Sequence, residues 1–188
     1  MTERRRRILA ISGSTRKQST SRRLLEYVAK SFENEIRLTI YDGIGHLPHF
    51  NPDLKKEHLP ESVDQFRALI ARAEGVLFCT PEYVFSLPGS LKNAIEWTVS
   101  TTLFSSKPVA MIVAAASGEK AYESLGLIMT TLESVLPEDA KLLIKGAKGK
   151  MKEDLAITDQ RIVAGIHRVM HSLVHTIEQK ITAPTKYQ

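Results

Sequence analysis

A regular alternation of short apolar runs with amphipathic stretches constrains the fold of this chain more than any other feature. Apolar runs of about four to eight residues are typical of buried strands, whereas apolar residues three and four positions apart mark one face of a helix. The expected strands are Ile8–Ser12, Ile36–Tyr41, Gly75–Thr80, Pro108–Ala115 and Ala140–Ile144. The expected helices are Ser21–Phe32, Glu61–Ala73, Pro88–Ser100, Lys120–Val135 and Thr158–Lys180. Strands that alternate with helices predict βαβ units on a parallel sheet.

These elements predict an α/β fold, a three-layer α/β/α sandwich built on a five-stranded parallel sheet. Right-handed crossovers leave few strand orders for such a sheet, and 2-1-3-4-5 is one of them. Ile36–Tyr41 alternates apolar and polar residues, which is typical of a strand near the sheet edge. Ligands bind outside the carboxyl ends of such strands, at the point where the strand order reverses. We therefore expect the functional site in the loops that follow Ile11, Thr80 and Ala115.

The first of these loops is rich in hydroxyl groups and lies directly before a helix. Arg16 stands within it, and Gly13 permits a tight turn and a close backbone approach. Its hydroxyl residues include Ser12, Ser14, Ser19, Thr20 and Ser21. A helix N-terminus adds unpaired backbone N–H groups and the positive end of the helix dipole, so the loop predicts a site for a phosphate monoester. The alternative is a simple hydroxyl helix cap beside a surface arginine, which the position after the first strand disfavours.

Other phosphate-binding loops are excluded by residue type. The loop has no Gly-Lys-Ser/Thr ending, which a nucleoside triphosphate loop needs, and no G-x-G-x-x-G, the usual dinucleotide fingerprint. A cysteine-dependent phosphatase needs its thiol nucleophile in this loop, and the single cysteine, Cys79, lies elsewhere.

The second loop, Thr80–Trp97, is stiffened by proline and glycine. Its Tyr83 can lie beside a planar ring, and backbone amides around Glu82 can meet the polar edge of that ring. Together the two loops resemble the NADPH-dependent FMN reductase family. The resemblance rests on the motifs Gly13-Ser14-x-Arg16-x-x-Ser19 and Pro81-Glu82-Tyr83 through Ser86-x-Pro88-Gly89-x-x-Lys92-Asn93, and element lengths match over residues 6–180.

The resemblance implies a flavodoxin-like fold that binds FMN. It implies that Ser14, Arg16, Ser19 and Ser21 surround the phosphate. It also implies that Pro81, Glu82 and Tyr83 contact the isoalloxazine or ribityl region. The complete predicted FMN site is Ser12, Ser14, Arg16, Ser19, Thr20, Ser21, Pro81, Glu82, Tyr83, Val84, Ser117 and Gly118.

The chain departs from the family in three places within this site. Ser21 and Val84 stand where the family usually has asparagine. A serine at position 21 can still donate to a phosphate, whereas Val84 removes a hydrogen-bonding side chain. The third loop, Ala116–Lys120, lacks the paired glycines of relatives, and its Ser117 and Gly118 are expected to flank the ring.

A bound flavin carries the chemistry in this interpretation, so no catalytic side chain is expected. FMN takes a hydride from NADPH or NADH and passes electrons to free flavin, a quinone or another small acceptor. One alternative is an enzyme of the same fold that acts chiefly as a quinone or azo-compound reductase. Another is a non-enzymatic electron carrier of this fold, which the formal charge of +5 disfavours because such carriers tend to be acidic.

The basic N-terminus, the histidines of the last helix and the single cysteine predict no further functional site. Arg4–Arg7 is expected to be a solvated basic terminus, and no nucleic-acid or membrane partner is predicted. No metal site is expected, because no carboxylate or cysteine completes the row of His167, His171 and His175. One cysteine permits no intrachain disulfide and no signal peptide is recognisable, so the expected compartment is the cytoplasm.

We expect residues 1–188 to form a single FMN-binding domain, with flexible ends at 1–6 and 182–188. The resemblance implies a homodimer, or a homotetramer. Apolar residues of the third helix exceed what one core face needs, and the resemblance implies that the chains pair through this region, with FMN near the interface. These residues are Leu87, Leu91, Ile95 and Trp97.

Overall fold

The computed structural model describes residues 4–54, 58–150 and 155–182. It contains a five-stranded, wholly parallel sheet in the order β2-β1-β3-β4-β5, which confirms the predicted fold class and strand order. The strands are β1 (Arg6–Ser12), β2 (Ile36–Tyr41), β3 (Gly75–Thr80), β4 (Val109–Ala115) and β5 (Lys141–Lys145). β2 lies at the sheet edge, as its alternating pattern predicts, and its burial alternates accordingly.

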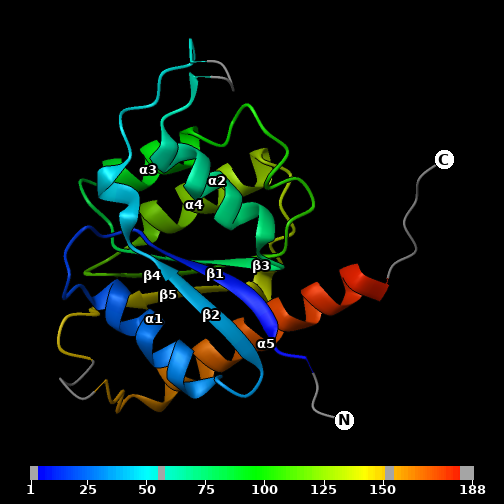
Figure 1. Ribbon diagram of the computed structural model, residues 1–188. Coiled ribbons are helices and arrows are strands. Elements are labelled where there is room, and N and C mark those ends of the chain that lie inside the picture. Colours follow the sequence, from blue (N-terminus) through cyan, green and yellow to red (C-terminus); the bar gives the residue numbers. More distant parts are fainter. Residues whose placement is uncertain (1–3, 55–57, 151–154, 183–188) are drawn as a thin grey trace.

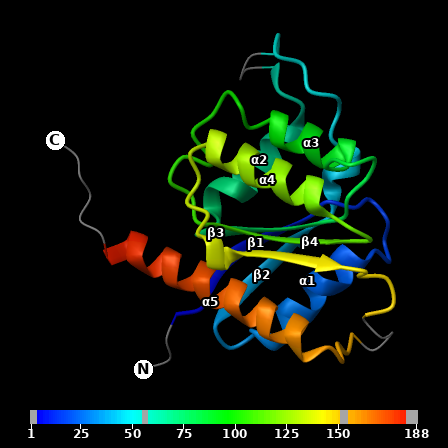
Figure 2. The ribbon, with the colours of Figure 1, turned by 180° about the vertical axis from the view of Figure 1, so that it is seen from behind.

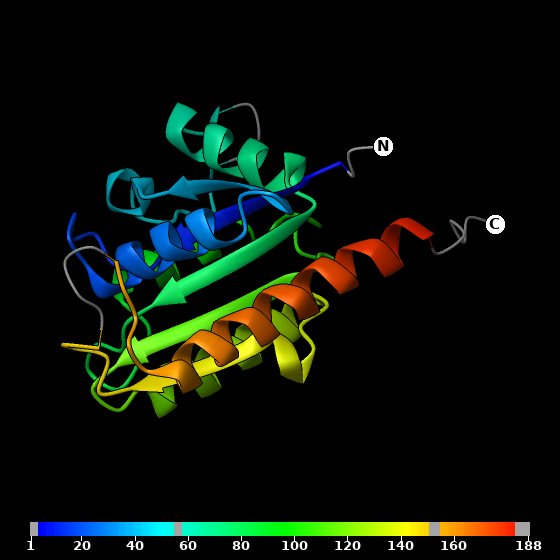
Figure 3. The ribbon, with the colours of Figure 1, turned by 90° about the horizontal axis from the view of Figure 1, so that it is seen from below.

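Two layers of helices cover the sheet, as Figures 1 and 2 show. Three helices pack on one face: α2 (Glu61–Arg72), α3 (Gly89–Glu96) and α4 (Glu119–Thr131). Two pack on the other: α1 (Thr20–Ser31) and α5 (Gln160–Thr182). Seen from below in Figure 3, α1 and α5 lie along the sheet, nearly in line with its strands, and α5 extends past it toward the C-terminus.

The apolar residues of the central strands divide between the two faces of the sheet. In β1, Ile8 and Ala10 belong to the core under α1 and α5, whereas Leu9 and Ile11 belong to the core under α2, α3 and α4. Side chains of a strand point alternately to opposite faces, so a strand covered on both sides must be apolar throughout. This double burial explains the unbroken apolar runs that predicted the central strands.

Two helices end earlier than the sequence pattern predicts. α3 stops at Glu96 rather than Ser100, because Arg67 Nε donates to the Trp97 carbonyl at 2.7 Å and the Thr98 hydroxyl donates to the Ile95 carbonyl at 2.7 Å. The Trp97 carbonyl lies past the last turn of the helix, and the Ile95 carbonyl accepts from the Thr98 backbone N–H at 2.9 Å as well as from the hydroxyl.

α4 ends at Thr131 rather than at Val135, and a backbone conformation accounts for the stop. Glu133 has φ +57°, in the left-handed region that no right-handed helix contains. Its carbonyl then accepts from the backbone N–H of Ser106 at 2.8 Å, which ties the end of α4 to the loop before β4.

The apolar residues of the third helix do not form an outward face. Leu87, Leu91, Ile95 and Trp97 are all buried within their own chain. Trp97 fills the space beneath the loop after β2 and donates its indole N–H to the Pro48 carbonyl at 2.8 Å. The inference that these four residues exceed one core face is therefore wrong, because the loop after β2 covers the side of the helix that the sheet does not.

The two chain ends lie mostly outside the described residues. Of the stretch 1–6, Arg6 is already the first residue of β1, and its backbone N–H donates to the Glu35 carbonyl at 3.0 Å. Of the stretch 182–188, residue 182 closes α5. Among the helices in the described ranges, none is long and apolar enough to cross a membrane.

Candidate functional site

A cavity of about 370 Å³ opens at the carboxyl ends of the strands, where the loops after β1, β3, β4 and β5 meet. Its volume lies within the range of about 300–1,000 Å³ that is typical of ligand pockets. The lining residues are Ser14, Arg16, Gln18, Ser19, Thr20, Ser21, Pro81, Glu82, Tyr83, Ala114, Ala115, Ala116, Ala147 and Lys148. The two loops that the sequence singled out therefore meet around one space.

The first loop presents free donors at the start of α1. Ser19 is the N-cap residue, and its hydroxyl oxygen accepts from Arg22 N–H at 3.1 Å. The backbone N–H groups of Thr20 and Ser21 have no acceptor within the part of the chain that the structure describes. Both residues line the cavity. Unpaired amides at a helix N-terminus are an anion-binding arrangement, and here they belong to residues of the cavity lining.

Arg16 supplies a cation at the same place. Arg16 is part of the cavity lining, and its side chain forms no ion pair with any described residue. Its backbone N–H donates to the Ser14 hydroxyl at 3.3 Å, which leaves the hydroxyl hydrogen of Ser14 available to a ligand. The hydroxyls, the amides and the guanidinium fit a phosphate monoester.

Two of the predicted hydroxyls are turned to the protein interior. Ser12 is buried and donates to the Ser14 carbonyl at 3.2 Å, so it supports the loop from beneath and does not line the cavity. Ser21 is also buried, and its side chain is hydrogen-bonded to the thiol of Cys79. What Ser21 offers the cavity is its backbone N–H.

Gly13 is needed for space and not for a special backbone angle. Its φ lies outside the left-handed region, but a Cβ there would stand 2.2 Å from the Thr80 hydroxyl oxygen and 2.9 Å from Leu91 Cδ2. The first loop therefore packs directly on the end of β3. Gly13 lies in a bend directly after β1, and its missing side chain lets the loop approach Thr80 of β3 and Leu91 of α3 closely.

Glu82 holds the second and third loops together. One carboxylate oxygen accepts from the Ser117 hydroxyl at 3.0 Å and the Gly118 N–H at 3.2 Å. The other accepts from Lys120 N–H at 2.8 Å and Ala121 N–H at 3.0 Å. Gly118, the N-cap residue of α4, has no side chain to cap the helix, so Glu82 caps it from another loop. These bonds, led by that from Ala121, lower the pKa of Glu82.

The third loop lies further from the cavity than predicted. Ser117 and Gly118 both bond to Glu82 and do not line the cavity. The lining here is Ala114–Ala116, the end of β4. Small side chains at this position leave room for a flat group between the loops after β3 and β5.

Val84 lies at the tip of a short turn and outside the cavity lining. Tyr83 and Ser86 exchange two backbone hydrogen bonds, of 2.9 and 3.1 Å, and enclose Val84 and Phe85 at φ +51° and +54°. Val84 is 96 % exposed and Phe85 77 %. Positive φ at both central residues is the mark of a type I′ turn, which favours Asn-Gly rather than Val-Phe.

The structure thus brings eight of the predicted site residues to one cavity: Ser14, Arg16, Ser19, Thr20, Ser21, Pro81, Glu82 and Tyr83. It also adds residues that the sequence argument missed, namely Gln18, Ala147 and Lys148. The signal for the last two is the position of their loop after β5, since all carboxyl ends of a parallel sheet meet at one edge.

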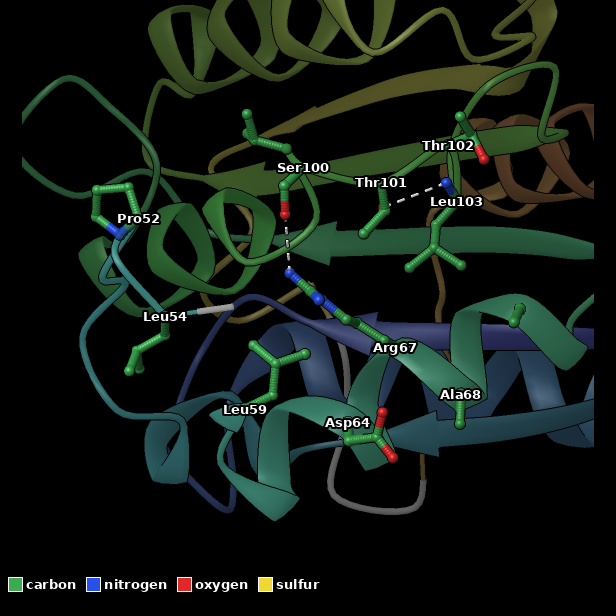
Figure 4. A pocket seen from close by; sticks show the side chains of 12 residues that line it. Pro52, Leu54, Leu59, Asp64, Arg67, Ala68, Ser100, Thr101, Thr102 and Leu103 are labelled. Carbon is green, nitrogen blue, oxygen red and sulfur yellow. Dashed lines mark hydrogen bonds between the residues drawn. The ribbon is translucent and has the colours of Figure 1, made fainter. Parts of the chain in front are cut away.

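A second, larger hollow of about 1,050 Å³ lies away from the strand ends, over α2 and the segment after α3 (Figure 4). Leu54 and Leu59 stand on one side and Leu103 on the other, with Asp64 and Arg67 between them. No group of three or more residues suited to a metal ion occurs among the described residues.

Comparison with known proteins identifies the chain. A family model described as NADPH-dependent FMN reductase matches residues 6–149. The chain belongs to this family. The match confirms the resemblance that the two loop motifs indicate, and with it FMN and NAD(P)H as the cofactors of the family.

Individual relatives agree with the family. The chain is 31 % identical to a protein named NADH-dependent flavin reductase subunit 2 from Lactobacillus johnsonii, over 92 % of this chain and 98 % of that one. It is 33 % identical to an NADPH azoreductase from a Bacillus species, over 69 % of this chain and 70 % of that one. The solved structure of FerB, a flavoenzyme NAD(P)H:(acceptor) oxidoreductase from Paracoccus denitrificans, superposes with a TM-score of 0.82 at 27 % identity, over 93 % and 98 % of the two chains.

Proposed function

We propose that this protein is an FMN-dependent oxidoreductase that takes a hydride from NADPH or NADH and passes electrons to a small acceptor. The observation that carries the proposal is the 370 Å³ cavity, in which a phosphate cradle and a ring-sized space lie side by side. Ser14, Ser19, the amides of Thr20 and Ser21, and Arg16 fit the phosphate of FMN. Pro81, Tyr83 and Ala114–Ala116 fit the sides of a planar ring.

The side chains of this cavity hold the cofactor and do not transfer protons in this proposal. The bound flavin supplies hydride chemistry. Glu82 is the acidic residue on the lining, and each of its oxygens already accepts two hydrogen bonds that favour its charged form. A carboxylate so held keeps the loops after β3 and β4 in place and is a poor proton donor at neutral pH.

The acceptor is proposed from the relatives, since the cavity alone does not select one. One relative is named a flavin reductase and another an azoreductase. The names of both relatives describe acceptors that are flat and conjugated. Free flavin, quinones and azo compounds are all molecules of this kind. The relatives also differ in coenzyme, one NADH-dependent and one NADPH-dependent.

Anaerobic mixing tests this function directly. The FMN-loaded protein should lose its yellow absorbance when NADPH or NADH is added and regain it when free flavin, a quinone or an azo dye follows. Turnover rates with the three acceptors then separate a flavin reductase from a quinone or azo-compound reductase. Bound FMN that neither coenzyme reduces would instead identify an electron carrier.

We further propose that the protein is a homodimer, or a homotetramer, in the cytoplasm. Exposed apolar side chains support association: Leu54 and Val99 border the hollow of Figure 4, and Phe85 stands 77 % exposed at its turn. Cys79 is a buried free thiol, which fits a reducing compartment. Sedimentation of wild type and Val99→Asp tests the assembly, since a charge in the interface should produce monomers.

A further inference from the structure

Two helices begin at the carboxyl edge of the sheet, on opposite faces of it: α1 follows β1, and α4 follows β4. Each helix N-terminus carries backbone N–H groups that the helix itself leaves unpaired, together with the positive end of a helix dipole. Both N-termini are therefore positions at which an anion is stabilised. They differ in whether the protein leaves them open.

The N-terminus of α1 is open. Its first turn contains no acidic residue. The backbone N–H groups of Thr20 and Ser21 have no acceptor among the described residues, and both residues line the cavity. Arg16, on the same lining, adds a cation that forms no ion pair within the described part of the chain. The donors of this N-terminus are therefore available to a ligand.

The N-terminus of α4 is filled by a side chain from another loop. One oxygen of the Glu82 carboxylate accepts from Lys120 N–H at 2.8 Å and Ala121 N–H at 3.0 Å. The other accepts from Gly118 N–H at 3.2 Å and from the Ser117 hydroxyl at 3.0 Å. Four donors thus surround this carboxylate as they would surround an external anion.

The acidic residue of the first turn of α4, Glu119, does not replace Glu82 in these bonds. Its carboxylate forms an ion pair with Lys145, which lies at the end of β5. Glu82, by contrast, is at once a residue of the cavity lining and the anion at α4. The site that FMN enters therefore has one open anion position, at α1, and one that the protein fills with its own carboxylate.

We propose that Glu82 directs the phosphate of FMN to α1, because its carboxylate occupies the competing position at α4. Glu82 is then a specificity-determining residue, which fixes the end of the cavity at which the phosphate binds and hence the direction in which the flavin lies. This inference rests on the proposed function. The carboxylate acts against a phosphate at α4 in two ways, since it takes the donors and since like charges repel.

The affinities of two flavins test the inference in a variant whose α1 position is weakened. Arg16→Ala should lower the preference for FMN over riboflavin, which lacks the phosphate. Adding Glu82→Ala should raise that preference again, about three- to tenfold, because the donors at α4 become available. Loss of the loop contacts weakens both flavins alike, so the ratio of their dissociation constants isolates the phosphate.

The matched control for the double variant is Arg16→Ala with Glu123→Ala. Glu123 is also an acidic residue of α4, but it is exposed and lies outside the cavity lining. Its removal should leave the ratio of the two dissociation constants as it is in Arg16→Ala alone.

Inorganic phosphate provides a second measurement, on FMN-loaded protein in which FMN already fills the position at α1. Phosphate should raise the urea midpoint of Glu82→Ala more than that of wild type at equal ionic strength, because a ligand stabilises the folded state that binds it. Glu82→Gln takes the place of Glu82→Ala if the latter does not fold. Glutamine removes the charge and, with a single acceptor oxygen, leaves donors at α4 without a partner.

Two results would overturn the inference and leave the proposed function intact. One is a preference for FMN over riboflavin that is no higher in the double variant than in Arg16→Ala. The other is equal stabilisation of FMN-loaded wild type and Glu82→Ala by phosphate. If wild-type protein binds no FMN at all, the proposed function fails, and this inference fails with it.

Discussion

The carboxylate of Glu82 accepts a hydrogen bond from the backbone N–H of Ala121 at 3.0 Å, between residues 39 positions apart in the sequence. This bond joins the loop after β3 to the first turn of α4, whose own N-cap residue, Gly118, has no capping side chain. Both loops border the cavity or its rim, so a single carboxylate fixes their relative position. The side chain of Glu82 therefore supports the site by positioning these two loops.

Removing this cap should destabilise the protein. We expect Glu82→Ala to lower the free energy of unfolding of the apo-protein by about 1 kcal/mol, as loss of a helix N-cap usually does. Urea denaturation at neutral pH measures it. Glu123→Ala is a suitable control, because Glu123 is an exposed acid on the same helix and pairs with the side chain of Lys120. Equal stability of wild type and Glu82→Ala would contradict the capping role.

The same carboxylate predicts a pH dependence. Its folded-state pKa lies below the ordinary 4.5, first because of the bond from Ala121. A lowered folded pKa means that the ionised group stabilises the fold above its unfolded pKa, and that this contribution disappears as the pH falls through the folded value. The stability difference between wild type and Glu82→Gln should therefore be full at neutral pH and shrink below pH 4.5. A difference that is constant from neutral to acid pH would argue against it.

Arg16 should contribute a charged contact to FMN. Arg16→Ala removes a hydrogen bond to a charged group, worth about 1.5–3 kcal/mol, so the FMN dissociation constant should rise about tenfold or more. Fluorescence titration with FMN and with riboflavin measures it, and riboflavin affinity should change little. Lys17→Ala is the control, because Lys17 is the neighbouring cation in the sequence and does not line the cavity. Unchanged FMN affinity in Arg16→Ala would place the phosphate elsewhere.

Cys79 should be unreactive in the folded protein. Burial raises the pKa of its thiol to about 12, although the hydrogen bond with Ser21 acts in the opposite direction. The reactive species is the thiolate, so a disulfide reagent at pH 8 should label the native chain only as fast as it unfolds. Denaturant should release the single thiol to full labelling. Rapid labelling of the native protein would contradict the burial of Cys79 within β3.

The turn at Val84 and Phe85 should carry strain. A left-handed backbone costs an ordinary residue about 1–2 kcal/mol, and a β-branched residue adopts it least readily. The double variant Val84→Asn with Phe85→Gly introduces the residues that a type I′ turn favours. We expect it to unfold at a higher urea concentration than wild type, compared at equal oligomeric state. A lower midpoint would show that the two apolar side chains stabilise the protein through contacts of their own.

The sequence predicted those parts of the fold that depend on local pattern. β3 is buried throughout because α-helices cover it on both faces, and its bounds, Gly75–Thr80, agree with the prediction. The ends of α3 and α4 depend on distant partners instead. Arg67 takes a carbonyl after α3, and Ser106 binds the Glu133 carbonyl after α4. No periodicity within either helix contains that information.

The site shows the same division between local and distant information. The hydroxyl-rich loop and the start of α1 are neighbours in sequence, so their meeting at Ser14, Ser19 and Arg16 could be predicted. The hydrogen bonds of the Glu82 side chain could not be predicted, because they depend on how the loops after β3 and β4 settle at the sheet edge. Lys148 could have been included from the position of its loop after β5. Residues joined only by tertiary contact give no signal in a single sequence.

Equilibrium binding of FMN tests the central claim most directly. Apo-protein titrated with FMN and, separately, with riboflavin should bind FMN with a dissociation constant of about 1 μM or lower and riboflavin at least tenfold more weakly, because the donors at the start of α1 hold the phosphate. Weaker FMN binding, or equal affinity for the two flavins, would contradict the assignment of this loop as a phosphate cradle and of the cavity as a flavin site.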